Sequence, residues 1–155
     1  MFSTLQELFD KFTGASPEDT PAGREHAVRL AAAVLLVEVM KADTVLDPEQ
    51  RQAIRTALVA RFGLAEQELG QLIAQAESQA QHANDFFHFT SRLNDHCSQP
   101  DKIALVEAMW NVAYANGVLD ASEIHVISKV AGLLHVTHGE YIAAKMRAKQ
   151  AAGLD

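Results

Sequence analysis

The sequence has 155 residues, 48% of them hydrophobic but only 6% aromatic, which suits a single domain whose core is filled by Ala, Leu, Val and Ile from packed helices. Acidic residues outnumber basic ones by 20 to 13, and no dense group of Lys and Arg is present to neutralise phosphates, so we exclude nucleic acid as a partner. The longest apolar run is too short to cross a bilayer, so we expect no membrane insertion. The amino terminus has no signal-peptide pattern and the single cysteine permits no internal disulfide, so we expect a cytoplasmic protein.

Residues 1–20 are expected to form an amino-terminal helix and a loop. Five apolar residues recur there at helical spacing, namely Phe2, Leu5, Leu8, Phe9 and Phe12. Residues 22–42 are apolar almost all round, which predicts a helix that its neighbours bury on several sides. Asp47 and Pro48 then supply an N-cap and a first-turn proline for a third helix that ends at Gly63. Residues 64–80 predict a fourth helix, followed by a polar break at 81–85.

Four more helices are predicted in the second half of the chain. Residues 86–97 indicate a fifth helix that stops before Pro100, because proline disfavours helical geometry in the residue before it. Residues 103–113 predict a sixth helix, which ends at the Asn116-Gly117 pair. Asp120 and Thr137 are positioned to cap a seventh and an eighth helix. With no strand pattern in competition, we predict an all-α fold of about eight helices.

An internal repeat links the two halves of the sequence. When Asp47 is aligned with Asp120, 73 residues later, five positions are identical between residues 42–54 and 115–127. The repeated Val-Leu-Asp follows a buried helix, so we expect the Val-Leu pair to fill the turn and the aspartate to cap the returning helix. The prediction is one domain over residues 1–155, with halves at about 22–80 and 100–150 that form helical hairpins related by a pseudo-twofold axis.

The acidic residues of these hairpins can be interpreted as structural, either as helix caps or as partners in ion pairs. Asp47 with Gln50, and Asp120 with Glu123, have the spacing of a capping box. Glu38 lies inside an otherwise apolar helix, and Glu107 lies inside its counterpart in the second half, so each needs a cationic partner, exposure to solvent or a bound proton. A functional acidic pocket between the hairpins stays open as the alternative.

Residues 41–49 (KADTVLDPE) and 114–123 (YANGVLDASE) resemble the paired Ala-Asp-Gly hairpins of the TerB-like family of tellurite resistance proteins. The likeness extends over about residues 24–148 and implies an all-helical, duplicated fold. It also implies a divalent-cation role for acidic residues around the two hairpins, which here are Glu38, Asp43, Asp47, Glu49, Glu107, Asp120 and Glu123. The chain departs from the family pattern at Thr44, where glycine is usual, and at Asn116, where aspartate is usual.

We therefore expect a non-enzymatic module with a role in stress or tellurite resistance, which binds a protein partner or a cation near its hairpins. One alternative is a metal-dependent enzyme with an acidic site between the halves. Another is a homodimer formed through the apolar face of residues 86–93. Zinc is disfavoured, because His135, His138 and the His96-Cys97 pair do not belong to a Cys-x-x-Cys or His-Glu-x-x-His motif.

Overall fold

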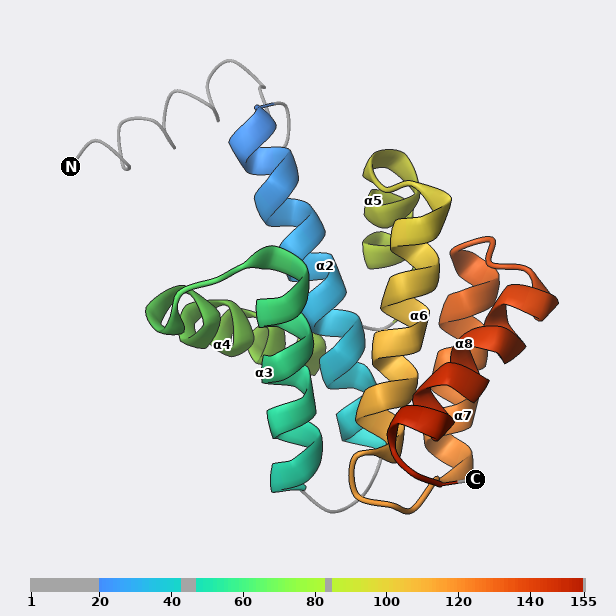
Figure 1. Ribbon diagram of the computed structural model, residues 1–155. Helices are drawn as coiled ribbons and strands as arrows, with labels where there is room; N and C mark the ends of the chain where they lie inside the picture. The colour runs from blue at the N-terminus through green and yellow to red at the C-terminus, as the bar shows by residue number, and fades with distance from the viewer. Residues whose placement is uncertain (1–19, 43–46, 83–84, 155) are drawn as a thin grey trace.

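A long buried helix, α2 (Pro21–Ala42), lies at the centre of the computed structural model (Figure 1). The structure describes residues 20–42, 47–82 and 85–154. In α2 every residue from Leu30 to Val37 is buried, because helices α3 to α7 all pack against it. The other helices are α3 (Pro48–Phe62), α4 (Glu66–His82), α5 (Phe87–His96), α6 (Gln99–Tyr114), α7 (Ala121–Leu133) and α8 (His138–Ala151).

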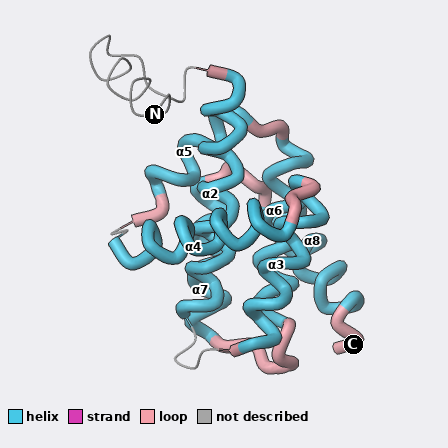
Figure 2. Tube along the Cα trace, turned by 90° about the vertical axis from the view of Figure 1, so that its left-hand side faces the viewer, coloured by secondary structure: helices cyan, strands magenta, loops and turns pink. Residues whose placement is uncertain are grey.

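The predicted all-helical class is confirmed: the described part of the chain holds seven helices and no strand (Figure 2). The helix predicted near the amino terminus lies outside the described residues. Within residues 20–42, 47–82 and 85–154, no helix is both long enough and apolar enough to cross a membrane.

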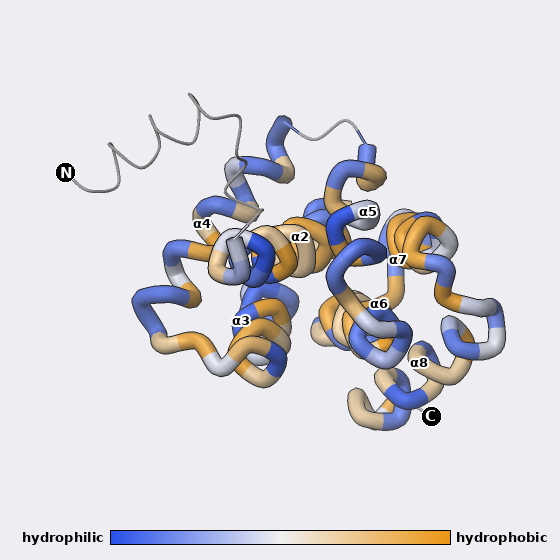
Figure 3. The backbone as a smooth tube through the Cα atoms, turned by 90° about the horizontal axis from the view of Figure 1, so that it is seen from above, coloured by the Kyte–Doolittle hydropathy of each residue, from blue (hydrophilic) through white to orange (hydrophobic). Residues whose placement is uncertain are grey.

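The α2–α3 and α6–α7 hairpins pack against each other reciprocally. Helix α2 contacts α6 and α7, while α3 contacts α6 in return. The outer helices follow the same scheme, since α4 covers α2 and α8 covers α6. Seen from above, α2 lies between α3 and α4 on one side and α6 to α8 on the other (Figure 3). This exchange of contacts is the one that two hairpins related by a pseudo-twofold axis would make.

Local capping sets where these helices begin and end. Asp47 and Thr137 cap α3 and α8 through side-chain oxygens that accept backbone N–H groups of the first turn. Gly63 ends α3 at φ 62°, and Gly117 follows α6 at φ 79°, left-handed conformations that glycine adopts without strain. The predicted turn residues therefore act as expected at the ends of these helices.

Two predictions were wrong, namely the start of the sixth helix and the role of Val118 in the turn. Helix α5 ends at His96, before Pro100 as predicted, but Pro100 itself lies in the first turn of α6, where its missing N–H leaves no hydrogen bond unmade. A Ser98–Asp101 capping box begins that helix four residues before the expected start at Ile103. In the second hairpin Val118 is 68% exposed, so it does not fill the turn, whereas Leu119 packs against the core. The corresponding residues 45 and 46 lie outside the described residues.

Candidate functional site

The two hairpin aspartates are helix caps. Asp47 Oδ1 accepts hydrogen bonds from the backbone N–H of Glu49 at 2.9 Å and of Gln50 at 3.4 Å. Asp120 Oδ1 accepts one from the N–H of Ser122 at 2.7 Å. Both carboxylates thus compensate the unpaired amides at a helix amino terminus, the structural role that the sequence spacing predicted.

The third residues of the two capped helices meet in the core. Glu123 closes its predicted capping box by accepting from the N–H of Asp120 at 3.1 Å. Its other oxygen, Oε2, accepts from Gln50 Nε2 at 2.5 Å, across the 73-residue offset of the repeat. Both side chains are 0% exposed. Gln50 therefore reaches across to the other hairpin, so the box predicted for Asp47 and Gln50 is not formed.

An unpaired oxygen accompanies this contact. Gln50 Oε1 is buried and accepts no hydrogen bond within the part of the chain that the structure describes. A buried amide oxygen without a donor is costly, so a group that could satisfy it would stabilise the junction of the hairpins.

The two glutamates inside the apolar helices are paired with cations of the same chain. Lys41 Nζ lies 3.5 Å from Glu38 Oε1 and also donates to the Ala80 carbonyl at 2.9 Å. Burial raises the pKa of the Glu38 carboxyl, and the nearby Lys41 only partly offsets this. Glu107 forms an ion pair with Arg147 of α8. Each glutamate thus has the cationic partner that its position demands.

The predicted cation ligands do not come together among the described residues. In residues 20–42, 47–82 and 85–154, no three His, Cys, Asp or Glu side chains form a group that could hold a metal ion. This includes His135, His138, His96 and Cys97. Asp43 lies outside the described residues, so a site that includes it stays a prediction.

A groove of about 750 Å³ lies between α2, α3, α5 and α6. Its floor is apolar, and charged side chains stand around it. The floor includes Val28, Ala32, Leu36, Leu58, Phe62 and Leu105. The charged lining consists of Arg24, Glu25, Arg61, Asp101, Lys102 and Glu107. An apolar floor with a polar rim is the usual anatomy of a binding site.

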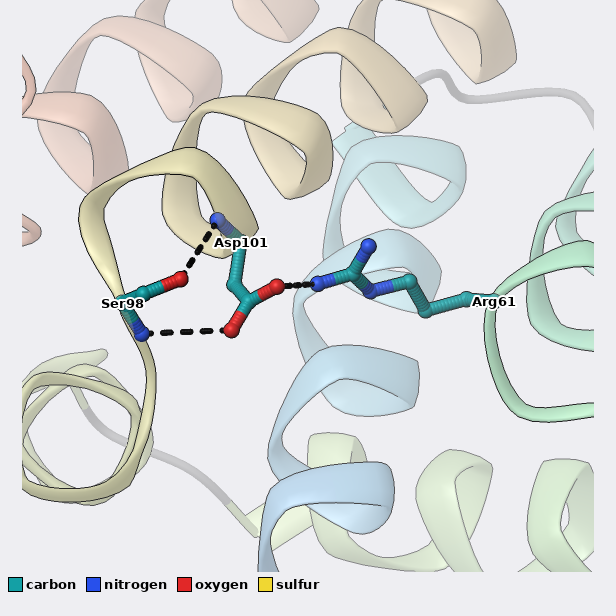
Figure 4. Close-up of polar contacts among 3 residues, drawn as sticks. All are labelled: Arg61, Ser98 and Asp101. Atoms are coloured by element: carbon teal, nitrogen blue, oxygen red, sulfur yellow. Dashed lines mark hydrogen bonds and ion pairs between the residues drawn. The ribbon is translucent and has the colours of Figure 1, made fainter.

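An ion pair crosses the rim of this groove. Asp101, in the first turn of α6, accepts from the Arg61 guanidinium near the end of α3 (Figure 4). Its second oxygen accepts from the Ser98 N–H at 3.2 Å, while the Asp101 N–H donates to Ser98 Oγ at 3.3 Å. The hydrogen bonds with Ser98 and the Arg61 guanidinium lower the pKa of the Asp101 carboxyl, which keeps this pair ionised.

Cys97 also lines the groove, and it is half-buried. Burial raises the pKa of its thiol, and the neighbouring Asp101 carboxylate raises it further. The thiol is therefore protonated at neutral pH, which does not favour a nucleophilic role.

The apolar face of residues 86–93 is largely used within the monomer. Phe89 and Leu93 are buried in the core, whereas Phe87 is 65% exposed. A homodimer through this face stays a prediction, and it would have to be built around Phe87 and its exposed neighbours.

Sequence reasoning missed the groove and the contact between Gln50 and Glu123. The groove is lined from four helices that are distant in sequence, and no local pattern reveals such a surface. The contact could have been found, because the repeat alignment already places residues 50 and 123 at equivalent positions.

Comparison with known proteins identifies a family. A family model described as "Tellurite resistance protein TerB" matches residues 29–146, most of the chain. The matched range runs from α2 into α8 and includes both hairpins and most of the groove. No curated protein and no solved structure matches the chain.

Proposed function

Because the chain belongs to the TerB family of tellurite resistance proteins, we propose that it is a non-enzymatic module that binds a protein partner in the groove of α2, α3, α5 and α6. The groove itself is the observation that carries this proposal. Its volume and apolar floor provide a surface that a partner side chain or helix could cover, and its charged rim could set the partner's orientation.

The state of Arg61, Asp101, Glu107 and Cys97 supports binding over catalysis at these residues. Arg61 and Asp101 are engaged with each other, and Glu107 is engaged with Arg147. Cys97 is held in its protonated form. Acid–base or nucleophilic chemistry needs a titratable group poised near neutral pH beside a partner that can exchange its proton.

A charge placed in the groove tests the proposal. Ala60 is exposed on α3 and lines the groove, whereas Ala74 is exposed on α4 and does not line it. Ala60→Asp should weaken partner binding about tenfold, which corresponds to about 1.4 kcal/mol. In a strain from which the gene is deleted, this variant should therefore give lower survival on tellurite than the wild type. Ala74→Asp should complement like the wild type. Equal survival of the two variants, with equal protein levels, would refute a role for the groove.

A cation near the hairpins is the second candidate, and the unpaired Gln50 Oε1 favours it. The amide nitrogen of the same side chain donates to the Glu123 carboxylate, and hard divalent cations prefer carboxylate and amide oxygens as ligands. Calorimetric titration with Ca²⁺, Mg²⁺, Mn²⁺ and Zn²⁺ tests it. Binding heat and a raised melting temperature should be lost in an Asp43→Asn, Asp120→Asn double variant. Absence of heat with every ion in the wild type would leave only partner binding.

A further inference from the structure

The groove opens beside the point at which the described chain begins. Thr20 precedes α2 and accepts from the Gly23 N–H at 2.9 Å, and Arg24 and Glu25, one turn into the helix, already line the groove. The groove then follows α2 as far as Leu36, a length of about 18 Å at the rise of an α-helix. Residues 1–19 are therefore joined to α2 at one end of the groove.

The apolar residues of this segment suit the groove in character and in length. Five of its large apolar residues, from Phe2 to Phe12, have the spacing of one helical face. As a helix, the distance from Phe2 to Phe12 would be about 15 Å, close to the length of the groove along α2. An apolar face with three phenylalanines needs a surface to cover it, because leaving it in water forgoes about 2 kcal/mol per large side chain.

The connection permits the segment to turn back along α2. Residues 13–19 include Gly14 and Pro17, which are typical of turns. Seven residues lie within the usual range for loops between antiparallel helices, and they reach about 23 Å when extended. Helices α2 and α6 both run from top to bottom in Figure 1. A segment that folds back from Thr20 would therefore lie between these two helices.

The charges of the groove and of residues 1–19 are complementary. The end of the groove near the start of α2 has more basic than acidic side chains. The basic ones are Arg24, Arg61 and Lys102, and the acidic ones are Glu25 and Asp101. Residues 1–19 carry four carboxylates, at positions 7, 10, 18 and 19, and one lysine. The segment therefore brings net negative charge to the end of the groove that has the excess of basic side chains.

We propose that residues 1–12 of this chain occupy the groove as its intramolecular ligand, which a partner must displace in order to bind. The need for displacement rests on the proposed function, whereas occupancy of the groove does not. A tethered ligand lowers the apparent affinity of every competitor for the same surface, so the amino terminus sets how readily the module is engaged.

The native thiol of Cys97 reports on occupancy, because it lines the groove and is the only cysteine of the chain. Its reaction with the disulfide reagent DTNB is measured at pH 8 in the full chain. Phe9→Glu places a charge on the apolar face and should speed the reaction about tenfold, if the groove is filled about nine-tenths of the time. Ser3→Glu adds the same charge on the polar face and should react like the wild type. Equal rates for wild type and Phe9→Glu would overturn the proposal.

A cross-link gives an independent readout. Phe9→Cys should form a disulfide with Cys97 of the same chain under mild oxidation, whereas Glu7→Cys, on the opposite face of the segment, should not. Disulfides between two chains, or a protection of Cys97 that increases with protein concentration, would assign the groove to a second copy and overturn the proposal. The result of the thiol and cross-linking experiments does not depend on the tellurite assay. Residues 1–12 can occupy the groove even if Ala60→Asp behaves like the wild type in that assay, and Ala60→Asp can lower survival even if residues 1–12 do not occupy the groove.

Discussion

Replacing Glu123 by alanine removes the contact that joins the two hairpins in the core. The variant leaves Gln50 Nε2 without its 2.5 Å acceptor and opens the capping box at Asp120. A buried donor left unpaired costs about 1–3 kcal/mol, and a lost cap costs about 1 kcal/mol. We therefore expect the free energy of unfolding to fall by about 3 kcal/mol. For a domain of this size, that lowers the melting temperature by about 6–12 °C.

Urea unfolding measures this loss directly. Trp110 is the only tryptophan and is fully buried, so its fluorescence reports the loss of the core. A double-mutant cycle with Gln50→Ala isolates the contact from the cap, because only the contact involves both residues. We expect a coupling energy of about 1–2 kcal/mol between residues 50 and 123. Additive losses in the double variant would show that the contact itself contributes nothing, and the reasoning would be refuted.

Three further predictions concern the helix ends. Ser98→Ala should lower the free energy of unfolding by about 1 kcal/mol in urea titrations, because it removes the N-cap of α6, and an unchanged midpoint would contradict this. The lowered pKa of Asp101 means that its contribution to stability is present above the unfolded value of about 3.9 and is lost as pH falls through the folded value. In carboxyl NMR titrations, Ser98→Ala and Arg61→Ala should each raise that pKa, because each removes a group that lowers it; an unchanged pKa in either variant would be inconsistent with the structure. Gly63→Ala should cost about 1 kcal/mol in the same urea assay, since a Cβ there meets no neighbour and only the left-handed backbone is strained; a neutral result would argue against that conformation.

The helix boundaries that the sequence predicted well are those with a local cause. Asp47, Pro48 and Gly63 act through their own backbone and their nearest neighbours in sequence, so α3 could be placed to the residue. Similarly, the continuous apolar sequence of α2 was sufficient to predict its central position, because only a helix covered on several sides can bury every face.

The start of α6 was misjudged because proline is ambiguous. Pro100 disfavours helix in the residue before it and equally suits the first turn of a new one. The spacing of Ser98 and Asp101, a capping box, would have decided between the two. The groove was beyond the reach of sequence, since its lining depends on how α2, α3, α5 and α6 pack, and packing distances carry no local pattern.

The meeting of Gln50 and Glu123 has a consequence for symmetry. In a dimer of two identical hairpin chains, a side chain at this position would face its own copy. Two glutamates would bring like charges together away from water, and two glutamines would remove the carboxylate that closes the capping box of α7. When both hairpins lie in one chain, each can carry its own side chain, so an amide donates to a carboxylate. A symmetric homodimer cannot make this heterologous pair, and joining the halves covalently is what permits it.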